Sequence, residues 1–259
     1  MLWVRTLWAI CIPTILLCGC SQLPPEAIQL LESGKRSYDT QRYDQAVAKL
    51  DRFLASYGTG QPAAEARYIR GLSLVQKGQL RRGRRDLERS LAVSKCPELT
   101  AKAHVAVGSL DWADGRTDAA LEHYRQALGG LEDRPPKDVV LYRLGVDLQR
   151  QGQWTQARRH FAEIIDGYQD SKVNKAARLR FSWTYKFFTI QAGAFKDRRR
   201  AQQQVKKLRQ VGLAAEQRLD ARSGRPLYVV QVGQYDTFAE ARAELPRVRR
   251  AAGEAIIVP

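Results

Sequence analysis

Glycines recur at a fixed interval over the N-terminal part of this 259-residue chain. Four of them are spaced 37 residues apart, at Gly34, Gly71, Gly108 and Gly145. A small residue follows each after 12 positions, at Ala46, Gly83, Ala120 and Ala157. A large apolar residue follows after 16, at Leu50, Leu87, Tyr124 and Phe161. Small residues where helices cross and large ones between them are typical of stacked helix-turn-helix repeats, so the spacing predicts an α-solenoid.

This pattern resembles the tetratricopeptide repeat (TPR), whose usual period is about 34 residues. Gly78, Gly115 and Gly152 fall where that family turns between its two helices, and Gln41 takes this place in the first unit. The resemblance implies four helix hairpins in a domain that spans residues 26–186. The amphipathic run 172–186 is expected to form a helix that covers the last hairpin, as terminal repeats require.

The TPR resemblance also implies a concave groove that takes a segment of a partner protein. The aromatic residues at the groove positions of the family are Tyr38, Tyr68, Trp112 and Tyr142. Packing between repeats explains each of them at least as well, so the partner groove stays one of two interpretations.

The last 73 residues, 187–259, contain two copies of one short pattern. Residues 188–195 read Phe-Thr-Ile-Gln-Ala-Gly-Ala-Phe, and residues 228–235 read Tyr-Val-Val-Gln-Val-Gly-Gln-Tyr. Each copy begins with β-formers, is expected to turn at its glycine, and precedes a basic helical run. The pattern predicts strands and helices in the order 187–192, 198–211, 214–220, 227–232, 237–252 and 255–258, of which the second and fifth are helices. Pro246 is expected to kink or shorten the second helix.

These paired Gln-Xaa-Gly-Xaa-aromatic patterns resemble the sporulation-related repeat (SPOR) domain of bacterial cell-envelope proteins. The resemblance implies a βαββαβ, ferredoxin-like fold that binds peptidoglycan glycan strands stripped of their stem peptides. The complete chain is therefore expected to have two domains, a TPR-like α-solenoid followed by a SPOR domain at 187–259.

Alternation along the strands divides the SPOR residues between two faces. Thr189 and Gln191 share one face, and Val229 shares a face with Gln231. The helices are expected to cover the apolar face and to leave open the polar face, where the two glutamines lie on neighbouring central strands. Amide side chains have donors and an acceptor, which suit sugar hydroxyls and N-acetyl groups. The residues expected to contact glycan are Thr189, Gln191, Ala194, Gln217, Val229 and Gln231. Gln191 and Ala194 occupy family positions implied in this contact, although Ala194 replaces the commoner serine. An ordinary solvated sheet face is the alternative.

The N-terminus has the features of a lipoprotein export signal. Arg5 precedes the short apolar run Leu7–Leu17, and Leu-Cys-Gly-Cys at 17–20 resembles a bacterial lipobox. The resemblance implies that residues 1–19 are removed, that Cys20 carries lipid and that residues 20–25 form a tether. Ser21 favours the outer membrane over the inner membrane. An uncleaved membrane anchor is the alternative interpretation.

Composition limits the chemistry of the chain. The formal net charge of +16 fits attraction to acidic polymers or anionic lipid, and equally fits solvated helix faces. The sequence contains no Gly-rich phosphate loop, HExxH pattern or Cys/His ligand cluster. We therefore predict no enzymatic activity, no cofactor and no metal site.

Two functions follow from these features. The first is a non-catalytic lipoprotein on the periplasmic side of the outer membrane, which binds stripped glycan and recruits partners, with enrichment at the division septum. The second is a TPR scaffold of an outer-membrane assembly or secretion machine, whose C-terminal domain binds protein. Nucleic-acid binding is set aside, because RNA-recognition sheets need aromatic residues where this face offers Gln and Thr.

Overall fold

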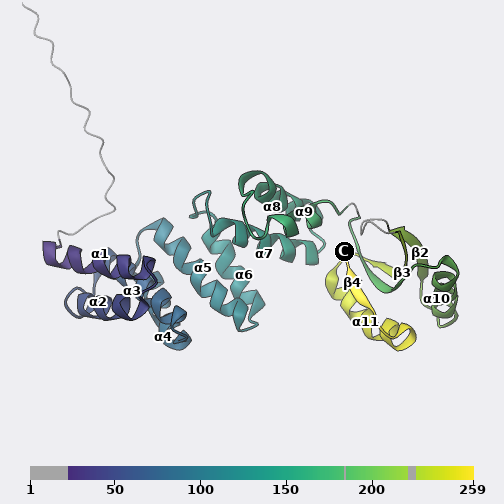
Figure 1. The fold of residues 1–259 in the computed structure, drawn as a ribbon, viewed down its shortest axis with the longest axis horizontal. Helices are drawn as coiled ribbons and strands as arrows, with labels where there is room; N and C mark the ends of the chain where they lie inside the picture. The colour runs from purple at the N-terminus through teal and green to yellow at the C-terminus, as the bar shows by residue number, and fades with distance from the viewer. Residues whose placement is uncertain (1–22, 184, 221–225) are drawn as a thin grey trace, which may run out of the picture. The chain divides into compact units, whose positions relative to one another are not determined.

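The computed structural model describes residues 23–183, 185–220 and 226–259, which form two compact units that divide between Asp114 and Gly115. The first unit contains α1 (Pro25–Asp39), α2 (Tyr43–Ser56), α3 (Gly60–Gln76), α4 (Leu80–Val93) and α5 (Pro97–Ala113) (Figure 1). The second begins with α6 (Thr117–Leu128), α7 (Lys137–Arg150), α8 (Trp154–Gly167) and α9 (Asn174–Phe181). The predicted helical repeat region is confirmed, whereas a domain boundary at position 186 stays a prediction.

The turns between paired helices use residues in the left-handed backbone region. Gly78 and Gly152 both have φ of +76°. Gln41, which replaces glycine in the first unit, has φ of +58°. Glycine adopts this conformation without steric cost, so the recurring glycine at this place has a physical reason.

The period-37 glycines allow close helix packing. A Cβ built on Gly34 would lie 2.8 Å from the Leu50 side chain, and one on Gly145 would lie 2.8 Å from Phe161. Leu50 and Phe161 are themselves fully buried. The missing side chain therefore makes room for the large residue 16 positions later, as the sequence pattern predicts.

Gly83, which stands where the family usually has alanine, lies in close contact with α3. A Cβ at this position would lie 2.7 Å from Val75 Cγ2 and 2.8 Å from the Gly71 carbonyl oxygen. Gly71 and Gly83 thus bring α3 and α4 into close backbone contact.

We expect Gly83→Ala to lower the free energy of unfolding by about 1–3 kcal/mol, because overpacking outweighs the better helix propensity of alanine. Chemical denaturation monitored by circular dichroism measures this change. Gly129→Ala is the matched control, since a Cβ at Gly129 has no contact within 4 Å. A Gly83→Ala variant as stable as the control would contradict the close packing of these two helices.

The predicted covering helix is present but short. α9 ends at Phe181, and the N–H of Ser182 donates to the Arg178 carbonyl in its last turn. Ala177 of α9 is buried in one cluster with Phe161 and Ile164. The helix therefore covers apolar residues of α8, although Ser182 and Trp183 do not extend it as the sequence pattern predicts.

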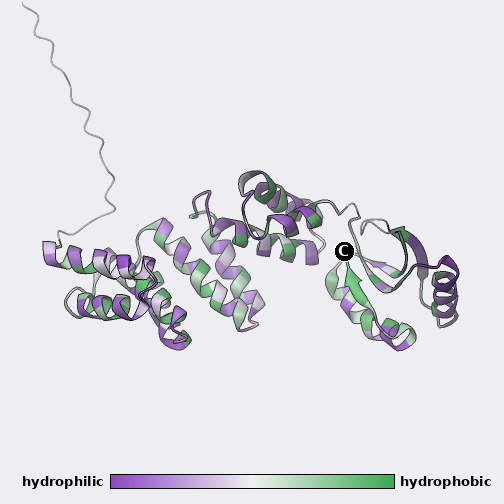
Figure 2. Cartoon of the chain, viewed as in Figure 1, coloured by the Kyte–Doolittle hydropathy of each residue, from purple (hydrophilic) through white to green (hydrophobic). Residues whose placement is uncertain are grey.

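The C-terminal part has the predicted βαββαβ order. Its elements are β1 (Phe188–Phe195), α10 (Arg198–Gln210), β2 (Ala215–Asp220), β3 (Leu227–Tyr235), α11 (Phe238–Ala252) and β4 (Ile256–Val258). The strands form one antiparallel sheet in the order β2-β3-β1-β4. Figure 2 shows β4 as hydrophobic, in contrast to the hydrophilic α10.

One hydrophobic cluster joins the sheet to its two helices. Ile190, Val230 and Val232 of the central strands pack with Leu208 of α10 and Val248 of α11. α11 continues through Pro246 to Ala252, so Pro246 does not shorten the helix, and a kink at this position stays a prediction. A proline removes one helical hydrogen bond, and the packing of the following turn against the sheet offsets this loss.

Candidate functional site

The two central strands bring Gln191 and Gln231 together. β1 and β3 are antiparallel neighbours, and Gln191 is directly opposite Gln231 in their register. Opposite residues in paired strands share one face of the sheet. Ile190, Val230 and Val232 point to the other face, into the cluster under α10 and α11. The predicted placement of two amides side by side, away from the helices, is confirmed.

This amide pair is the centre of a row that crosses all four strands. Glu216 of β2 lies opposite Gln231, and Ile256 of β4 lies opposite Gln191. In a second row, Val229 lies opposite both Ala194 and Arg218. We call this surface the amide face and define it by Gln191, Gln231, Ala194, Val229, Glu216 and Arg218.

Burial separates the members that a ligand can reach from those that support them. Ala194 is exposed and Gln191 is half-buried, whereas Gln231 is 8% exposed and Val229 5%. Thr189 is only 2% exposed, and its hydroxyl donates to the Val232 carbonyl at 3.2 Å. Thr189 therefore holds β1 to β3, and Gln191 is the more accessible half of the amide pair.

The expectation that Gln217 extends the amide face is wrong. Gln217 lies opposite Val230, which points into the core beneath the helices. Its neighbours Glu216 and Arg218 alternate to the amide face instead. The strand contains the signal for this arrangement, since Ala215, Gln217 and Leu219 share one side while three charged residues share the other.

The glycine and the aromatic residue of each repeated pattern have a structural role. A Cβ on Gly233, whose φ is +70°, would lie 2.5 Å from the Tyr235 ring, and one on Gly193 would lie 2.7 Å from the Phe195 ring. The register also shifts between Gln191 and Ala194, as at a β-bulge. The strands continue past both glycines, so the expected turns at these positions are wrong. In each pattern the glycine and the aromatic ring pack against each other, and the glutamine supplies the polar group.

Residues that were not predicted from the sequence border the amide face. The Arg218 guanidinium forms an ion pair with Glu216 at 3.1 Å and lies over the Tyr185 ring, with 4.5 Å between its central carbon and the ring centroid. The Tyr185 and Phe187 rings are 5.3 Å apart. Aromatic rings and a guanidinium beside two amides add flat apolar surface and a cation to the site. The alternation of charges along β2 could have identified Arg218 from the sequence.

The hairpin of α7 and α8 contacts the core of the sheet. Trp154 belongs to the same buried cluster as Phe188, with 5.0 Å between their ring centroids. The Arg150 guanidinium lies over the Phe238 ring at 5.1 Å. A Cβ on Gly152 would lie 2.8 Å from the Asp236 carbonyl oxygen. The last helical hairpin therefore contributes side chains to the C-terminal hydrophobic core.

The predicted groove aromatics take part in packing. Tyr38 and Tyr68 are half-buried against the α1–α3 core cluster, and burial raises the pKa of the Tyr68 phenol above its usual range. Tyr142 accepts a hydrogen bond from Arg180 at 3.2 Å and lies 6.1 Å from the Phe161 ring. Trp112 is half-buried in α5. A partner-binding role for these residues stays a prediction.

Cys20 and the predicted export signal, residues 1–19, lie outside the described residues. Among the helices that the structure describes, none combines the length and apolarity that crossing a membrane requires. Within the same described ranges, no group of three or more His, Cys, Asp or Glu side chains could hold a metal ion.

Four family models match parts of the chain. The SPOR domain model matches residues 184–259, and two tetratricopeptide repeat models match residues 70–138 and 139–171. A model described as an outer membrane lipoprotein matches residues 28–102. The chain thus has tetratricopeptide repeats followed by a C-terminal SPOR domain.

Two solved structures illustrate what part of this chain is similar to. MamA is 22% identical, with a TM-score of 0.44, over 60% of this chain and 82% of its own. A tetratricopeptide repeat protein from Parabacteroides merdae is 16% identical, with a TM-score of 0.47, over 61% of this chain and 59% of its own. No curated protein sequence matches the chain.

Proposed function

We propose that this protein, which carries tetratricopeptide repeats and a C-terminal SPOR domain, is a non-catalytic cell-envelope protein that binds peptidoglycan through its amide face. The ligand is a glycan strand from which the stem peptides have been removed. One observation carries the proposal, namely the directly opposed pair Gln191 and Gln231 on the side of the sheet away from its helices. The helical repeats bind a partner protein.

The chemistry of the amide pair fits a sugar chain. Each glutamine amide offers two donors and one acceptor, and opposite Cβ atoms in an antiparallel pair are about 5 Å apart. Two such groups bind neighbouring polar substituents of one sugar ring, such as an N-acetyl group and a hydroxyl. The Tyr185 ring beside Arg218 provides the apolar surface against which a sugar ring packs.

Binding to isolated sacculi tests the proposal. Residues 23–259 are the material of choice, because Trp154 belongs to the C-terminal core and a fragment from 187 onward lacks it. We expect the protein to co-sediment with sacculi, and to do so more strongly after an amidase has removed the stem peptides. If the protein binds neither treated nor untreated sacculi, glycan binding is refuted.

We further propose that Cys20 carries a lipid that anchors the protein to the periplasmic side of the outer membrane. The match of residues 28–102 to an outer membrane lipoprotein model supports this location. We expect Cys20→Ala to move the protein from the membrane fraction to the soluble fraction, with Cys96→Ala as the control. A Cys20→Ala protein that still fractionates with membranes would argue against lipidation.

Septal enrichment belongs to the same proposal, since stripped glycan arises where amidases act. A fluorescent fusion that stays uniform around dividing cells would contradict it.

The outer membrane lipoprotein match also favours a second function. In this alternative the repeats serve as a scaffold in an outer-membrane assembly machine, and the C-terminal domain binds protein. The two functions make opposite predictions in the sacculus experiment. Loss of partner binding on replacing Tyr68 or Tyr142, together with no sacculus binding by the unaltered protein, would favour the scaffold.

A further inference from the structure

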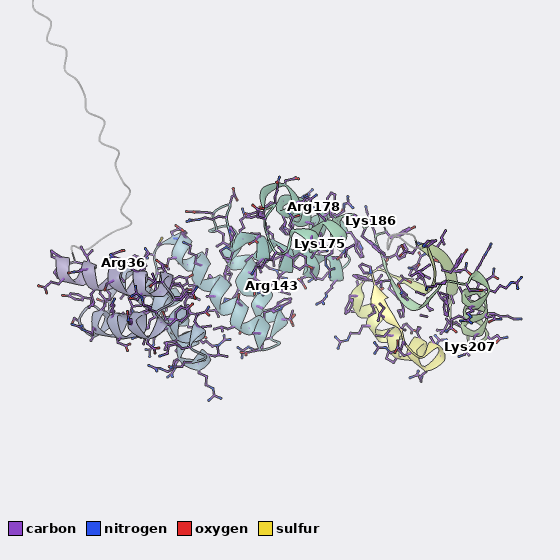
Figure 3. All side chains as sticks on the ribbon, in the orientation of Figure 1. Arg36, Arg143, Lys175, Arg178, Lys186 and Lys207 are labelled. Atoms are coloured by element: carbon purple, nitrogen blue, oxygen red, sulfur yellow. The ribbon has the colours of Figure 1, made fainter. Side chains whose placement is uncertain are left out.

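The helix α10 has an unusual balance of charge. Its 13 residues include six cations, Arg198, Arg199, Arg200, Lys206, Lys207 and Arg209, and no acidic residue. All six side chains are exposed. Within the described part of the chain none of them forms an ion pair, in contrast to Arg247 of α11, which pairs with Glu244 at 3.6 Å. Figure 2 shows α10 as hydrophilic along nearly its whole length, and Figure 3 shows the labelled Lys207 on it.

A hollow of about 620 Å³ lies between α10 and the edge strand β2. Arg198, Gln202 and Lys206 line it from one stripe of the helix, since residues four apart share a helix face. Arg209 lines it as well, and its Nε donates to the Ala215 carbonyl at 2.8 Å. Cations and amide groups therefore surround one concave site.

Gln217 lines the hollow from the strand side. Its Oε1 atom is buried and accepts no hydrogen bond from any described residue. A buried acceptor without a donor is costly, and such atoms usually face a ligand or an ordered water. The hollow thus offers positive charge for an anion and one free acceptor for a neighbouring hydroxyl group.

This site is separate from the amide face. Gln217 lies opposite Val230, on the helix side of the sheet, whereas Gln191 and Gln231 lie on the other side. A ligand on α10 therefore leaves the amide pair accessible.

We propose that α10 and the adjoining hollow bind an anionic phospholipid surface. The exposed cations of α10 extend beyond the hollow, so they can contact several phosphates of a membrane surface at once. Each cation near such a surface contributes about 1 kcal/mol to the free energy of binding. One headgroup with a phosphate and a hydroxyl, such as phosphoglycerol, occupies the hollow, where its phosphate meets Arg198 and Lys206 and its hydroxyl donates to Gln217. The domain would then bind a membrane surface on one side of its sheet and glycan on the other.

Vesicle flotation with residues 23–259 tests this inference, because that range omits the proposed lipid anchor. We expect binding to phosphatidylcholine vesicles that contain phosphatidylglycerol, no binding to pure phosphatidylcholine, and weaker binding at higher salt. Arg198→Gln with Lys206→Gln should weaken binding about 30-fold, whereas Arg198→Lys should retain it. The matched control is Arg81→Gln with Arg85→Gln, which removes the same charge from exposed positions on α4.

Three results would overturn the inference. If the α10 and α4 variants weaken vesicle binding equally, the net charge of the protein alone determines binding. Equal binding to both kinds of vesicle would exclude recognition of anionic lipid. Binding of free glycerol 3-phosphate as tight as that of vesicles would make the hollow a small-molecule site. Sacculus binding by the α10 variant should stay unchanged, so failure here is distinguishable from failure of the proposed glycan site.

Discussion

Replacing Trp154 by alanine is expected to destabilise the C-terminal sheet by about 3–5 kcal/mol, although Trp154 lies in a helix more than 30 residues before the first strand. The indole is 92% buried and packs with Phe188 of β1 in the core that contains Ile190 and Val232. Its removal leaves a cavity that these strands border. Large-to-small changes in such sites lose both the transfer free energy and the contacts around the cavity.

Amide hydrogen exchange measures this effect where it should occur. We expect protection of the β1 and β3 amides to fall at least about 100-fold, and protection in α1–α4 to stay unchanged. Trp154→Phe is the control, because a phenyl ring retains much of the contact with Phe188 and should cost less than half as much. Unchanged protection in both strands would mean that Trp154 packs only within the helical repeats.

Replacing both Gln191 and Gln231 by alanine is expected to weaken the binding of stripped glycan strongly. Each amide makes about two hydrogen bonds with a sugar, and each bond contributes about 0.5–1.5 kcal/mol net. The double variant should therefore bind stripped sacculi at least about 30-fold more weakly. Gln191→Ala alone should account for more of the loss than Gln231→Ala, because Gln191 is the more accessible of the two.

The controls separate a local from a general effect. Gln203→Ala removes an exposed amide from α10, on the opposite side of the sheet, and should bind as the unaltered protein does. Thermal unfolding should confirm that the double variant is folded, since neither glutamine belongs to the hydrophobic cluster under the helices. Full retention of sacculus binding by the folded double variant would remove the amide pair from the site.

The helical repeats could be predicted from the sequence because their constraints are local or periodic. The close contact of Gly34 with Leu50 recurs at Gly145 and Phe161, and the 37-residue interval displays it directly. The left-handed turn residues follow from the same register. The repeat interval does not show where the last helix ends. The predicted covering helix is therefore longer than the observed α9.

The C-terminal domain was predicted in its order but not in its details. Alternation placed Gln191 and Gln231 on one face, and the register confirms it. Gly193 and Gly233 were expected to turn the chain, because the packing of an aromatic ring over a strand glycine cannot be seen in a linear pattern. The contact of Trp154 with Phe188 was missed for a related reason, since a tryptophan inside a repeat is usually explained by the repeat itself.

Contact between stripped glycan and the amide pair can be observed directly in a nuclear magnetic resonance titration. Residues 23–259 labelled at the glutamine side-chain amides would be titrated with a glycan oligomer that lacks stem peptides. We expect the Gln191 and Gln231 side-chain resonances to shift with ligand, while those of Gln202 and Gln203 on α10 stay in place. Shifts confined to α10, with both amide-face resonances unmoved at saturation, would contradict it.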